Sequence, residues 1–468
     1  MNKAIESVVI VGGGTAGWIT AGLLAREHSA ASTHPLVITL IESPKIPTIG
    51  VGEGTWPSMR ATLEKIGISE TEFLRHCQAS FKQGTKFVNW RTQARDDFYY
   101  HPFSPPAAAG KIDLRTCWQQ NPDSRSLAFA DAVNFQQSLC EAGRAPKLIT
   151  TPEYKAVANY AYHLDAGHFA QLLKTHCVER LGVRHLLDEV ETIDQEADGT
   201  LTAVTTSSHG VIASDLFVDC TGFRALLIGK TLQVPLIDRT ATLFADHALV
   251  VQVPYTQADQ AVACQTIASA QNAGWIWDIG LSNRRGIGYV YSSTHSSHDQ
   301  AEKTLRQYVG EHTEISPRRI AFQSGYRARL WEKNCVAIGL SAGFLEPLEA
   351  SALMLVELSA TMLSERIPRH DGLLPVVARQ FNEQFLYRWE RIIEFLKLHY
   401  VLSKREEDFW ADNRRAASIP TRLQENLDLW RYHAPSKYDF FSRDEVFSWL
   451  SYQYVLYGMN GVNGLNGL

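Results

Sequence analysis

The chain has 468 residues, of which 45% are hydrophobic and 20% are charged, a balance typical of a globular protein with a large buried core. Its 45 basic and 50 acidic side chains leave a formal net charge of −5. A nucleic-acid-binding protein uses a basic excess to neutralise phosphates, so the charge argues against a nucleic-acid partner.

Cysteine spacing and hydropathy indicate the compartment. The seven cysteines are spread singly, without a C-x-x-C pair, which predicts reduced thiols, no metal site and a cytoplasmic location. No apolar run reaches the ~18 residues that span a bilayer. The first predicted strand begins close to Met1, which leaves no room for a cleaved signal, so we expect no membrane association. The oligomeric state is left open.

A glycine-rich turn follows the first predicted strand. The β-branched run Val8–Val11 predicts a buried parallel strand, and an apolar stretch ending near Leu24 predicts a helix. Between them, Gly12, Gly14 and Gly17 have the spacing G-x-G-x-x-G, which permits a sharp turn and the close approach of a pyrophosphate to a helix N-terminus.

The next strand completes the motif. The segment Leu36–Ile41 predicts a strand that ends in Glu42, where an acid can bind ribose hydroxyls. Strand, glycines, helix, strand and acid within about 30 residues predict a dinucleotide-binding α/β fold, the alternative being a glycine turn without a ligand.

The chain then alternates between loops, helices and strands. Prolines and glycines between 43 and 59 predict a long irregular loop that can fold over a cofactor. The expected elements that follow are helices at Met59–Ile66 and Glu70–Cys77, strands within 80–91 and 97–103, a surface loop at 104–110, mostly helix between 125 and 180, and strands at Arg184–Ile193, Leu201–Ser207 and Leu216–Phe223.

This order predicts interleaved domains. Because the chain leaves and re-enters one sheet, we expect a discontinuous cofactor- and substrate-contacting module at 1–375. Apolar residues then recur at helical spacing from Phe385 to Tyr400, which predicts a mainly helical C-terminal region at 376–468.

Five segments occur in the order seen in flavin-dependent halogenases, and the chain resembles the tryptophan halogenases of that family over roughly residues 5–405. They are GGGTAGW at 12–18, GVGEGTWP at 50–57, SFKQGTKFVNW at 80–90, GWIWDIGL at 274–281 and GLSAGFLEPLEAS at 339–351. Two positions depart from the family: Gly280 stands where it has proline, and Ala350-Ser351-Ala352 stands where it has Ser-Thr-Gly.

The resemblance implies a Rossmann-like FAD-binding fold of the flavin monooxygenase type. It implies FADH2 that is supplied by a separate, freely diffusing reductase, together with a halide ion. Hypohalous acid formed near the flavin would travel to an aromatic substrate held apart from it. The implied cofactor-binding residues are Gly12, Gly14, Thr15, Ala16, Gly17, Glu42, Gly50, Val51, Gly52, Glu53 and Leu340.

Two residues match the catalytic pair of the family. Lys82 would hydrogen-bond the hypohalous acid or form a haloamine, the alternative being a surface lysine like Lys86. Glu349 would orient the oxidant and accept the proton lost from the ring, the alternative being an acid in a helix first turn. Glu346 competes with Glu349 for this role.

Three further pairs follow from the resemblance. The backbone N–H groups of Ser351 and Ala352 would bind halide, with the preference between bromide and chloride left open. His101 and Phe103 would stack an indole, or are packing residues. Trp275 and Trp277 would face one side of a strand and form a wall between flavin and substrate; the alternative is that they belong to the ordinary aromatic core.

The sequence therefore predicts FADH2- and O2-dependent bromination or chlorination of an electron-rich aromatic, such as indole or a tryptophan-like compound, through hypohalous acid relayed to Lys82. One alternative is an FAD-dependent aromatic hydroxylase, and another is a non-catalytic flavin-binding protein. The natural substrate, its presentation free or on a carrier, and the regiochemistry stay open.

Overall fold

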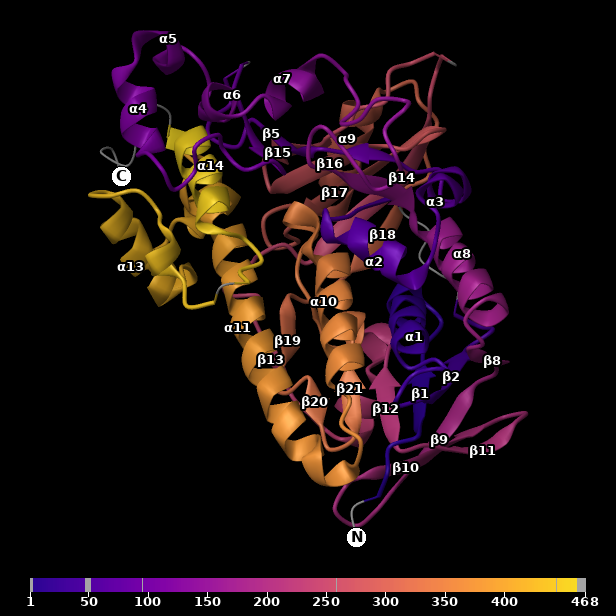
Figure 1. The fold of residues 1–468 in the computed structure, drawn as a ribbon. Helices are drawn as coiled ribbons and strands as arrows, with labels where there is room; N and C mark the ends of the chain where they lie inside the picture. Colours follow the sequence, from indigo (N-terminus) through magenta and orange to yellow (C-terminus); the bar gives the residue numbers. More distant parts are fainter. Residues whose placement is uncertain (1–2, 47–51, 95, 258, 443, 461–468) are drawn as a thin grey trace.

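The computed structural model describes residues 3–46, 52–94, 96–257, 259–442 and 444–460. Two large sheets lie at opposite ends of the molecule, and long helices run between them (Figure 1). The predicted residues Gly50 and Val51 lie outside the described part.

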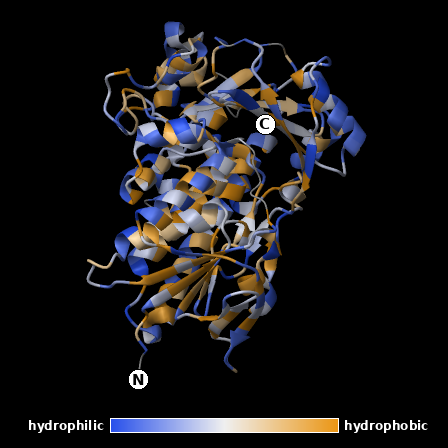
Figure 2. Ribbon diagram, turned by 90° about the vertical axis from the view of Figure 1, so that its right-hand side faces the viewer, coloured by the Kyte–Doolittle hydropathy of each residue, from blue (hydrophilic) through white to orange (hydrophobic). Residues whose placement is uncertain are grey.

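The first sheet has the strand order β20-β21-β12-β1-β2-β8, and all its neighbouring pairs except β20–β21 are parallel. Its strands are Ser7–Val11 (β1), Val37–Glu42 (β2), Arg184–Leu187 (β8), Leu216–Asp219 (β12), Trp331–Glu332 (β20) and Cys335–Ala337 (β21). Hydrophobic residues gather on these strands (Figure 2), as expected for parallel strands covered on both faces. The predicted strand–glycine–helix–strand unit is confirmed, with the helix at Thr15–Glu27 (α1).

The second sheet has seven strands in the order β18-β14-β17-β16-β15-β5-β6. They are Gly84–Val88 (β5), Phe98–Pro102 (β6), His247–Pro254 (β14), Thr266–Gln271 (β15), Gly274–Gly280 (β16), Arg284–Tyr291 (β17) and Arg318–Ala321 (β18). Segments from the first hundred residues thus pair with strands from the middle of the chain, through the parallel contact of β5 with β15.

A small sheet joins the two halves, in the order β3-β7-β4, and corrects two expectations. Gly52–Gly54 (β3) is a strand inside the segment expected to be an irregular loop. Ala161–Asp165 (β7) is a fully buried strand inside the segment expected to be mostly helical, and it pairs with Ser80–Lys82 (β4). The expected strand at Arg184–Ile193 is likewise broken into two, β8 and β9.

The remaining strands are short. They are Val190–Gln195 (β9), Leu201–Thr206 (β10), Gly210–Ala213 (β11), Leu236–Asp238 (β13), Gly325–Arg327 (β19) and Gly343–Phe344 (β22). The remaining helices are Ser58–Ile66 (α2), Glu70–His76 (α3), Leu114–Gln120 (α4), Pro122–Arg125 (α5), Phe129–Val133 (α6), Gln136–Glu141 (α7), Ala166–Glu179 (α8), His298–Val309 (α9), Ser351–Arg366 (α10), Leu374–Val401 (α11), Asp408–Asn413 (α12), Thr421–Trp430 (α13) and Trp449–Asn460 (α14).

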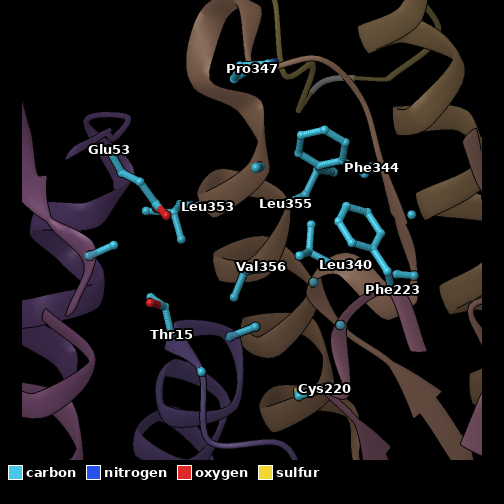
Figure 3. A pocket seen from close by; sticks show the side chains of 18 of the residues that line it. Thr15, Glu53, Cys220, Phe223, Leu340, Phe344, Pro347, Leu353, Leu355 and Val356 are labelled. Carbon is cyan, nitrogen blue, oxygen red and sulfur yellow. The ribbon is translucent and has the colours of Figure 1, made fainter. Parts of the chain in front are cut away.

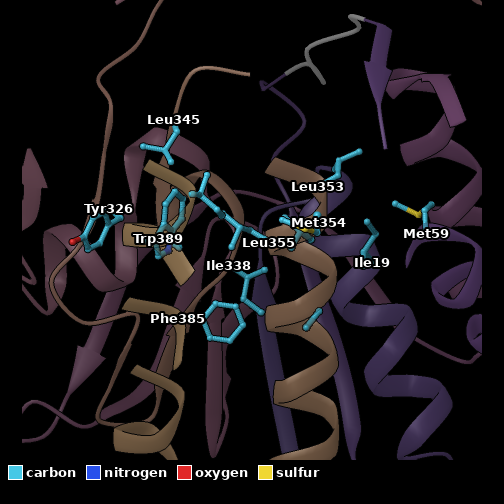
Figure 4. Packing of buried hydrophobic residues seen from close by; sticks show 14 of the residues in the cluster. Ile19, Met59, Tyr326, Ile338, Leu345, Leu353, Met354, Leu355, Phe385 and Trp389 are labelled. Carbon is cyan, nitrogen blue, oxygen red and sulfur yellow. The ribbon is translucent and has the colours of Figure 1, made fainter. Parts of the chain in front are cut away.

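Helices α1, α10 and α11 form the packed middle layer. Met354 and Leu355 of α10 lie between Ile19 of α1 and Phe385 of α11 (Figure 4), and all four side chains are buried. The amphipathic helix predicted after residue 375 is therefore α11, and its apolar face packs on the rest of the protein. No helix among the described residues is long and apolar enough to cross a bilayer.

Candidate active site

A cavity of about 530 Å³ opens at the carboxyl ends of β1, β2 and β12 and extends to the first turn of α10. Thr15 and Glu53 project from one side, and Phe344 lies on the facing side (Figure 3). In parallel α/β sheets, ligands bind at this edge. The predicted residues that line it are Gly12, Gly14, Thr15, Ala16, Glu42, Gly52, Glu53, Lys82, Trp275, Trp277, Leu340, Glu349, Ser351 and Ala352.

The glycine turn has the geometry that a dinucleotide requires. Gly12 has φ +121°, and a Cβ there would lie 2.1 Å from the carbonyl oxygen of Cys220. A Cβ on Gly17 would lie 2.0 Å from the Gly12 carbonyl oxygen, so this glycine allows close helix–turn packing and does not itself line the cavity. Gly14 instead faces open space, because its Cβ would meet no described atom within 4 Å. A pyrophosphate therefore fits between Gly14 and the N-terminus of α1.

Two acids lie at the same cavity. Glu42 Oε2 lies 3.0 Å from Lys174 Nζ and 2.8 Å from His185 Nε2, so its carboxylate is held at the end of β2, where a ribose would bind. Glu53 lies in β3, and burial, with the nearby charge of Asp165, raises the pKa of its carboxyl to about 7.

Lys82 ends β4 and is 1% exposed, which rules out the surface position considered as its alternative. Burial lowers the pKa of its ammonium to about 8, although the charge of Glu349 opposes that shift. Its Nζ lies 5.2 Å from the centre of the Phe103 ring. The amine is therefore partly neutral near physiological pH, as a reactive lysine requires.

Glu349 lies just before α10, with φ +64°, in the left-handed region. Its Oε1 lies 2.7 Å from His101 Nδ1 and 3.5 Å from His399 Nε2. Burial disfavours the carboxylate, but His101 first, then His399 and Lys82, bring the pKa of Glu349 below its ordinary value. The side chain is thus an ionised carboxylate inside the protein.

Lys82 and Glu349 come from β4 and the start of α10, yet each shifts the pKa of the other across the same cavity. Glu346 points elsewhere: Tyr400 Oη donates to its Oε1 at 2.5 Å, and burial raises the pKa of its carboxyl to about 7. Glu346 is not among the described residues that line the cavity. The geometry thus favours Glu349 over Glu346 as the partner of Lys82.

The turn that precedes α10 lies on the cavity. Ala350 has φ +55°, so two successive non-glycine residues, Glu349 and Ala350, occupy the left-handed region. Ser351 and Ala352 follow in the first helical turn, and no side chain among the described residues caps it. Both residues line the cavity, and a helix N-terminus favours an anion; halide binding by their N–H groups stays a prediction.

Trp275 and Trp277 lie on β16 with ring centres 6.3 Å apart, and both line the cavity, as expected for alternate residues of a strand. The structure also accounts for Gly280. A Cβ there would lie 2.8 Å from Val262 Cγ1 and 3.1 Å from Tyr255 Oη, so the neighbours leave no room for the proline of the family pattern.

His101 and Phe103 do not line this cavity among its described residues; they belong to an aromatic cluster behind Lys82 and Glu349. The Phe103 ring centre lies 5.6 Å from that of Trp56, which lies 5.1 Å from that of Phe447. Phe447, near the start of α14, in turn stacks on Phe395 of α11 at 3.8 Å.

Sequence reasoning did not assign a role to Trp56, Phe447 or His399. Trp56 falls inside the GVGEGTWP segment, and its Nε1 donates to the Glu349 carbonyl oxygen at 2.8 Å, so the motif itself carried a signal. His399 and Phe447 had no local signal, because long-range packing alone brings them to the site.

Comparisons with known proteins point to one family. The family model described as tryptophan halogenase matches residues 7–464. Tryptophan 6-halogenase SttH of Streptomyces toxytricini is 34% identical, over 97% of this chain and 89% of the relative. Tryptophan 7-halogenase RebH of Lentzea aerocolonigenes is 35% identical, over 92% of this chain and 83% of the relative.

Solved structures extend the likeness to the whole fold. The tryptophan halogenase from Shewanella frigidimarina superimposes with a TM-score of 0.94 at 48% identity, over 98% of this chain and 89% of that one. The flavin-dependent halogenase BrvH from Brevundimonas superimposes with a TM-score of 0.85 at 34% identity, over 97% and 90%. The chain therefore belongs to the tryptophan halogenase family and is a flavin-dependent enzyme that uses reduced FAD and halide.

Proposed function

We propose that the enzyme brominates or chlorinates an electron-rich aromatic of the indole class, either indole or a tryptophan-like compound. The observation that carries this proposal is the buried pair Lys82 and Glu349, placed on one cavity with the dinucleotide turn. The names of the relatives SttH and RebH, both tryptophan halogenases, support an indole ring as the acceptor.

Bound FADH2, supplied by a separate reductase, activates O2 and oxidises halide to hypohalous acid. The chain supplies the surroundings. The amides at the N-terminus of α1 hold the pyrophosphate, and those of Ser351 and Ala352 hold the halide. Trp275 and Trp277 form the wall that keeps the flavin and the aromatic substrate apart.

Lys82 holds the electrophile. Its Nζ donates a hydrogen bond to hypohalous acid, or, in the neutral form that burial favours, takes up the halogen as a haloamine and releases water. Glu349, kept ionised by His101, accepts the proton that the ring loses once the carbon–halogen bond has formed. His101 and Phe103 pack beside the substrate ring.

The test is mass spectrometry of indole and of tryptophan incubated with the protein, FAD, a flavin reductase, NADH and O2, with bromide and chloride separately. We expect a halide-dependent product that requires enzyme and persists with catalase. An oxygen-only mass shift would identify an aromatic hydroxylase instead. Tight FAD binding without any product across a panel of indoles, phenols and pyrroles would contradict catalysis on this class.

A further inference from the structure

A second imidazole lies beside the Glu349 carboxylate and has a partner of its own. His399, on α11, places its Nε2 3.5 Å from Glu349 Oε1. Its Nδ1 lies 2.5 Å from the hydroxyl oxygen of Tyr99, on β6. All three side chains are buried. Side chains from β6, α11 and the turn before α10 thus form a chain of contacts that ends at the proposed proton acceptor.

Aromatic neighbours hold the His399 ring in place. Its centre lies 4.7 Å from that of Phe87, and the two rings are stacked. The Phe87 ring also stacks on Tyr99 at 4.7 Å. Phe395, one turn earlier on α11, meets the imidazole edge-on at 5.2 Å. Because these contacts restrict rotation of the imidazole, its two nitrogens keep their separate neighbours.

These neighbours decide which ring nitrogen carries the proton. Glu349 is an ionised carboxylate, so a protonated Nε2 is attracted to Oε1, whereas a lone pair on Nε2 would be repelled. Nδ1 is then the acceptor, and the Tyr99 hydroxyl donates to it. Burial, opposed by the charge of Glu349, lowers the pKa of His399 to about 3, and burial raises the pKa of Tyr99 well above its ordinary value. The ring is therefore neutral and the hydroxyl keeps its proton.

The two oxygens of Glu349 have unequal surroundings. His101 Nδ1 and His399 Nε2 both lie at Oε1, and no described residue donates a hydrogen bond to Oε2. His399 Nε2 is buried and forms no hydrogen bond of its own among the described residues. Since a buried N–H without an acceptor costs stability, its position beside a buried carboxylate points to an electrostatic role.

We propose that Tyr99 and His399 are positioning residues for proton transfer to Glu349: Tyr99 holds His399 as the Nε2–H tautomer, and His399 acts with His101 to fix Oε1. Oε2 is then the atom that takes the proton from the substrate carbon. The electron pair of that C–H bond restores the aromatic ring, and neither Tyr99 nor His399 changes its protonation state. This inference rests on the proposed role of Glu349.

The first test needs no turnover. The full-length protein is labelled with 15N in its histidine rings and studied by NMR at pH 7, and the spectrum of His399→Gln identifies the His399 signals. We expect Nε2 to be protonated and Nδ1 to be an unprotonated acceptor, with the Nδ1 signal moving in Tyr99→Phe. A protonated Nδ1 or a doubly protonated ring would overturn the proposal.

The second test measures kcat against pH for the bromination of indole. The titratable groups that face Glu349 are His101, His399, Lys82 and Tyr99. Tyr99→Phe keeps the ring and removes the hydroxyl, so Nε2–H is held less firmly and the carboxylate is less stabilised. We expect the acid limb of the profile to move to higher pH while FAD affinity stays unchanged.

Three variants separate positioning from packing. The amide of His399→Gln can accept from Tyr99 and donate to Glu349, whereas His399→Phe can do neither. We expect the acid limb of His399→Gln to lie between those of the wild type and His399→Phe. Tyr100→Phe, at the next residue of β6, loses a hydroxyl that donates to Glu141 and should keep the wild-type profile.

A Tyr99→Phe enzyme that loses kcat equally at every pH would overturn the proposal, as would a His399→Phe enzyme with the acid limb of the wild type. A wild-type protein that forms no halogenated product would contradict the proposed function instead. The NMR measurement still decides the tautomer of His399 in that case, so the two failures are distinguishable.

Discussion

His101 Nδ1 lies 2.7 Å from Oε1 of Glu349, and both side chains are almost completely buried. A buried carboxylate without a partner becomes protonated, because the charged form is poorly solvated. Here burial is outweighed by His101, His399 and Lys82, which together bring the pKa of Glu349 below its ordinary value. The hydrogen bond to His101 thus helps to keep Glu349, the proposed proton acceptor, ionised, so that it can take up a proton.

Replacing His101 should therefore change the pH dependence of halogenation. His101→Phe keeps an aromatic ring but removes the nitrogen that Glu349 contacts, so the pKa of the carboxyl rises. Because the carboxyl is then protonated at a higher pH than in the wild type, we expect kcat of the variant to fall on the acid side at a higher pH, so that the ratio of kcat at pH 6 to kcat at pH 8 is lower than in the wild type. His295→Phe, which disturbs a pair with Asp412 outside the described cavity lining, serves as control. Equal loss at every pH would assign His101 a packing role only.

Lys82→Met should abolish halogenation while FAD binding stays nearly intact. A group that holds the electrophile contributes at least about 100-fold to the rate, and methionine cannot replace it. Lys86→Met is the matched control, since Lys86 lies four residues after Lys82, on β5, and its Nζ pairs with Glu141 at 2.7 Å. Product formation by Lys82→Met close to the wild-type rate would remove Lys82 from the mechanism.

The same variant should be more stable than the wild type at neutral pH. The pKa of Lys82 is about 8 in the folded protein against an ordinary value of 10.5, so charging the buried amine opposes folding below pH 8. That cost shrinks as pH rises from 8 to 10.5. We expect Lys82→Met to raise the free energy of unfolding at pH 7 by at most about 3 kcal/mol, with a smaller gain at pH 9. Denaturant unfolding at both pH values measures this; a destabilised variant at pH 7 would contradict it.

Substitutions at two glycines should distinguish cofactor binding from the catalytic step. A Cβ on Gly54 would lie 3.2 Å from Lys82 Nζ, so Gly54→Ala pushes the amine aside by a few tenths of an ångström. We expect kcat to fall about tenfold with FAD affinity unchanged, since reacting groups tolerate little displacement. Gly14→Ala fills space that a pyrophosphate would occupy, and its Cβ meets no described atom. That variant should weaken FAD binding at unchanged thermal stability. Fluorescence titration with FAD and steady-state kinetics distinguish the two; identical defects would contradict both assignments.

The sequence predicted the elements whose local pattern is strong. The run of β-branched residues before Gly12 and the helix after it are set by neighbours in sequence, and both appear where expected. The strand β7 was missed because all five of its residues, Ala161–Asp165, are buried, so the chain shows no alternation of polar and apolar side chains there. Its partners β3 and β4 lie far away in sequence.

The residues of the site also differ in whether the local sequence predicts them. Lys82 and Glu349 were predicted because each lies inside a characteristic segment. His399 lies on α11 and reads as one more residue of a helical pattern, yet its Nδ1 lies 2.5 Å from Tyr99 Oη and its Nε2 faces Glu349. Such a contact across 300 residues leaves no local trace, so only the fold could show it.

The buried acid Glu357 leads to a prediction about the pH dependence of the free energy of unfolding. Glu357 of α10 is 2% exposed and accepts from Thr62 at 2.6 Å and Ser58 at 3.2 Å, both on α2. Burial raises the pKa of its carboxyl to about 8, although these two hydroxyls oppose the shift. The pKa of this carboxyl in the unfolded chain has its ordinary value of 4.5. The stability that the protonated Glu357 gives the folded protein is therefore complete below pH 4.5 and is lost as pH rises through 8.

Glu357→Gln keeps the shape of the side chain without the charge, so its effect should depend on pH. We expect the variant to unfold with a free energy higher than wild type by about 4 kcal/mol at pH 9 and by far less at pH 5. Glu365→Gln, on the same helix but in an exposed pair with Lys65, should change stability by less than about 1 kcal/mol at either pH. Urea unfolding of the three proteins at both pH values decides the matter. A Glu357→Gln protein destabilised equally at pH 5 and pH 9 would mean that the hydrogen bonds to α2, and not the buried charge, set the stability of this contact.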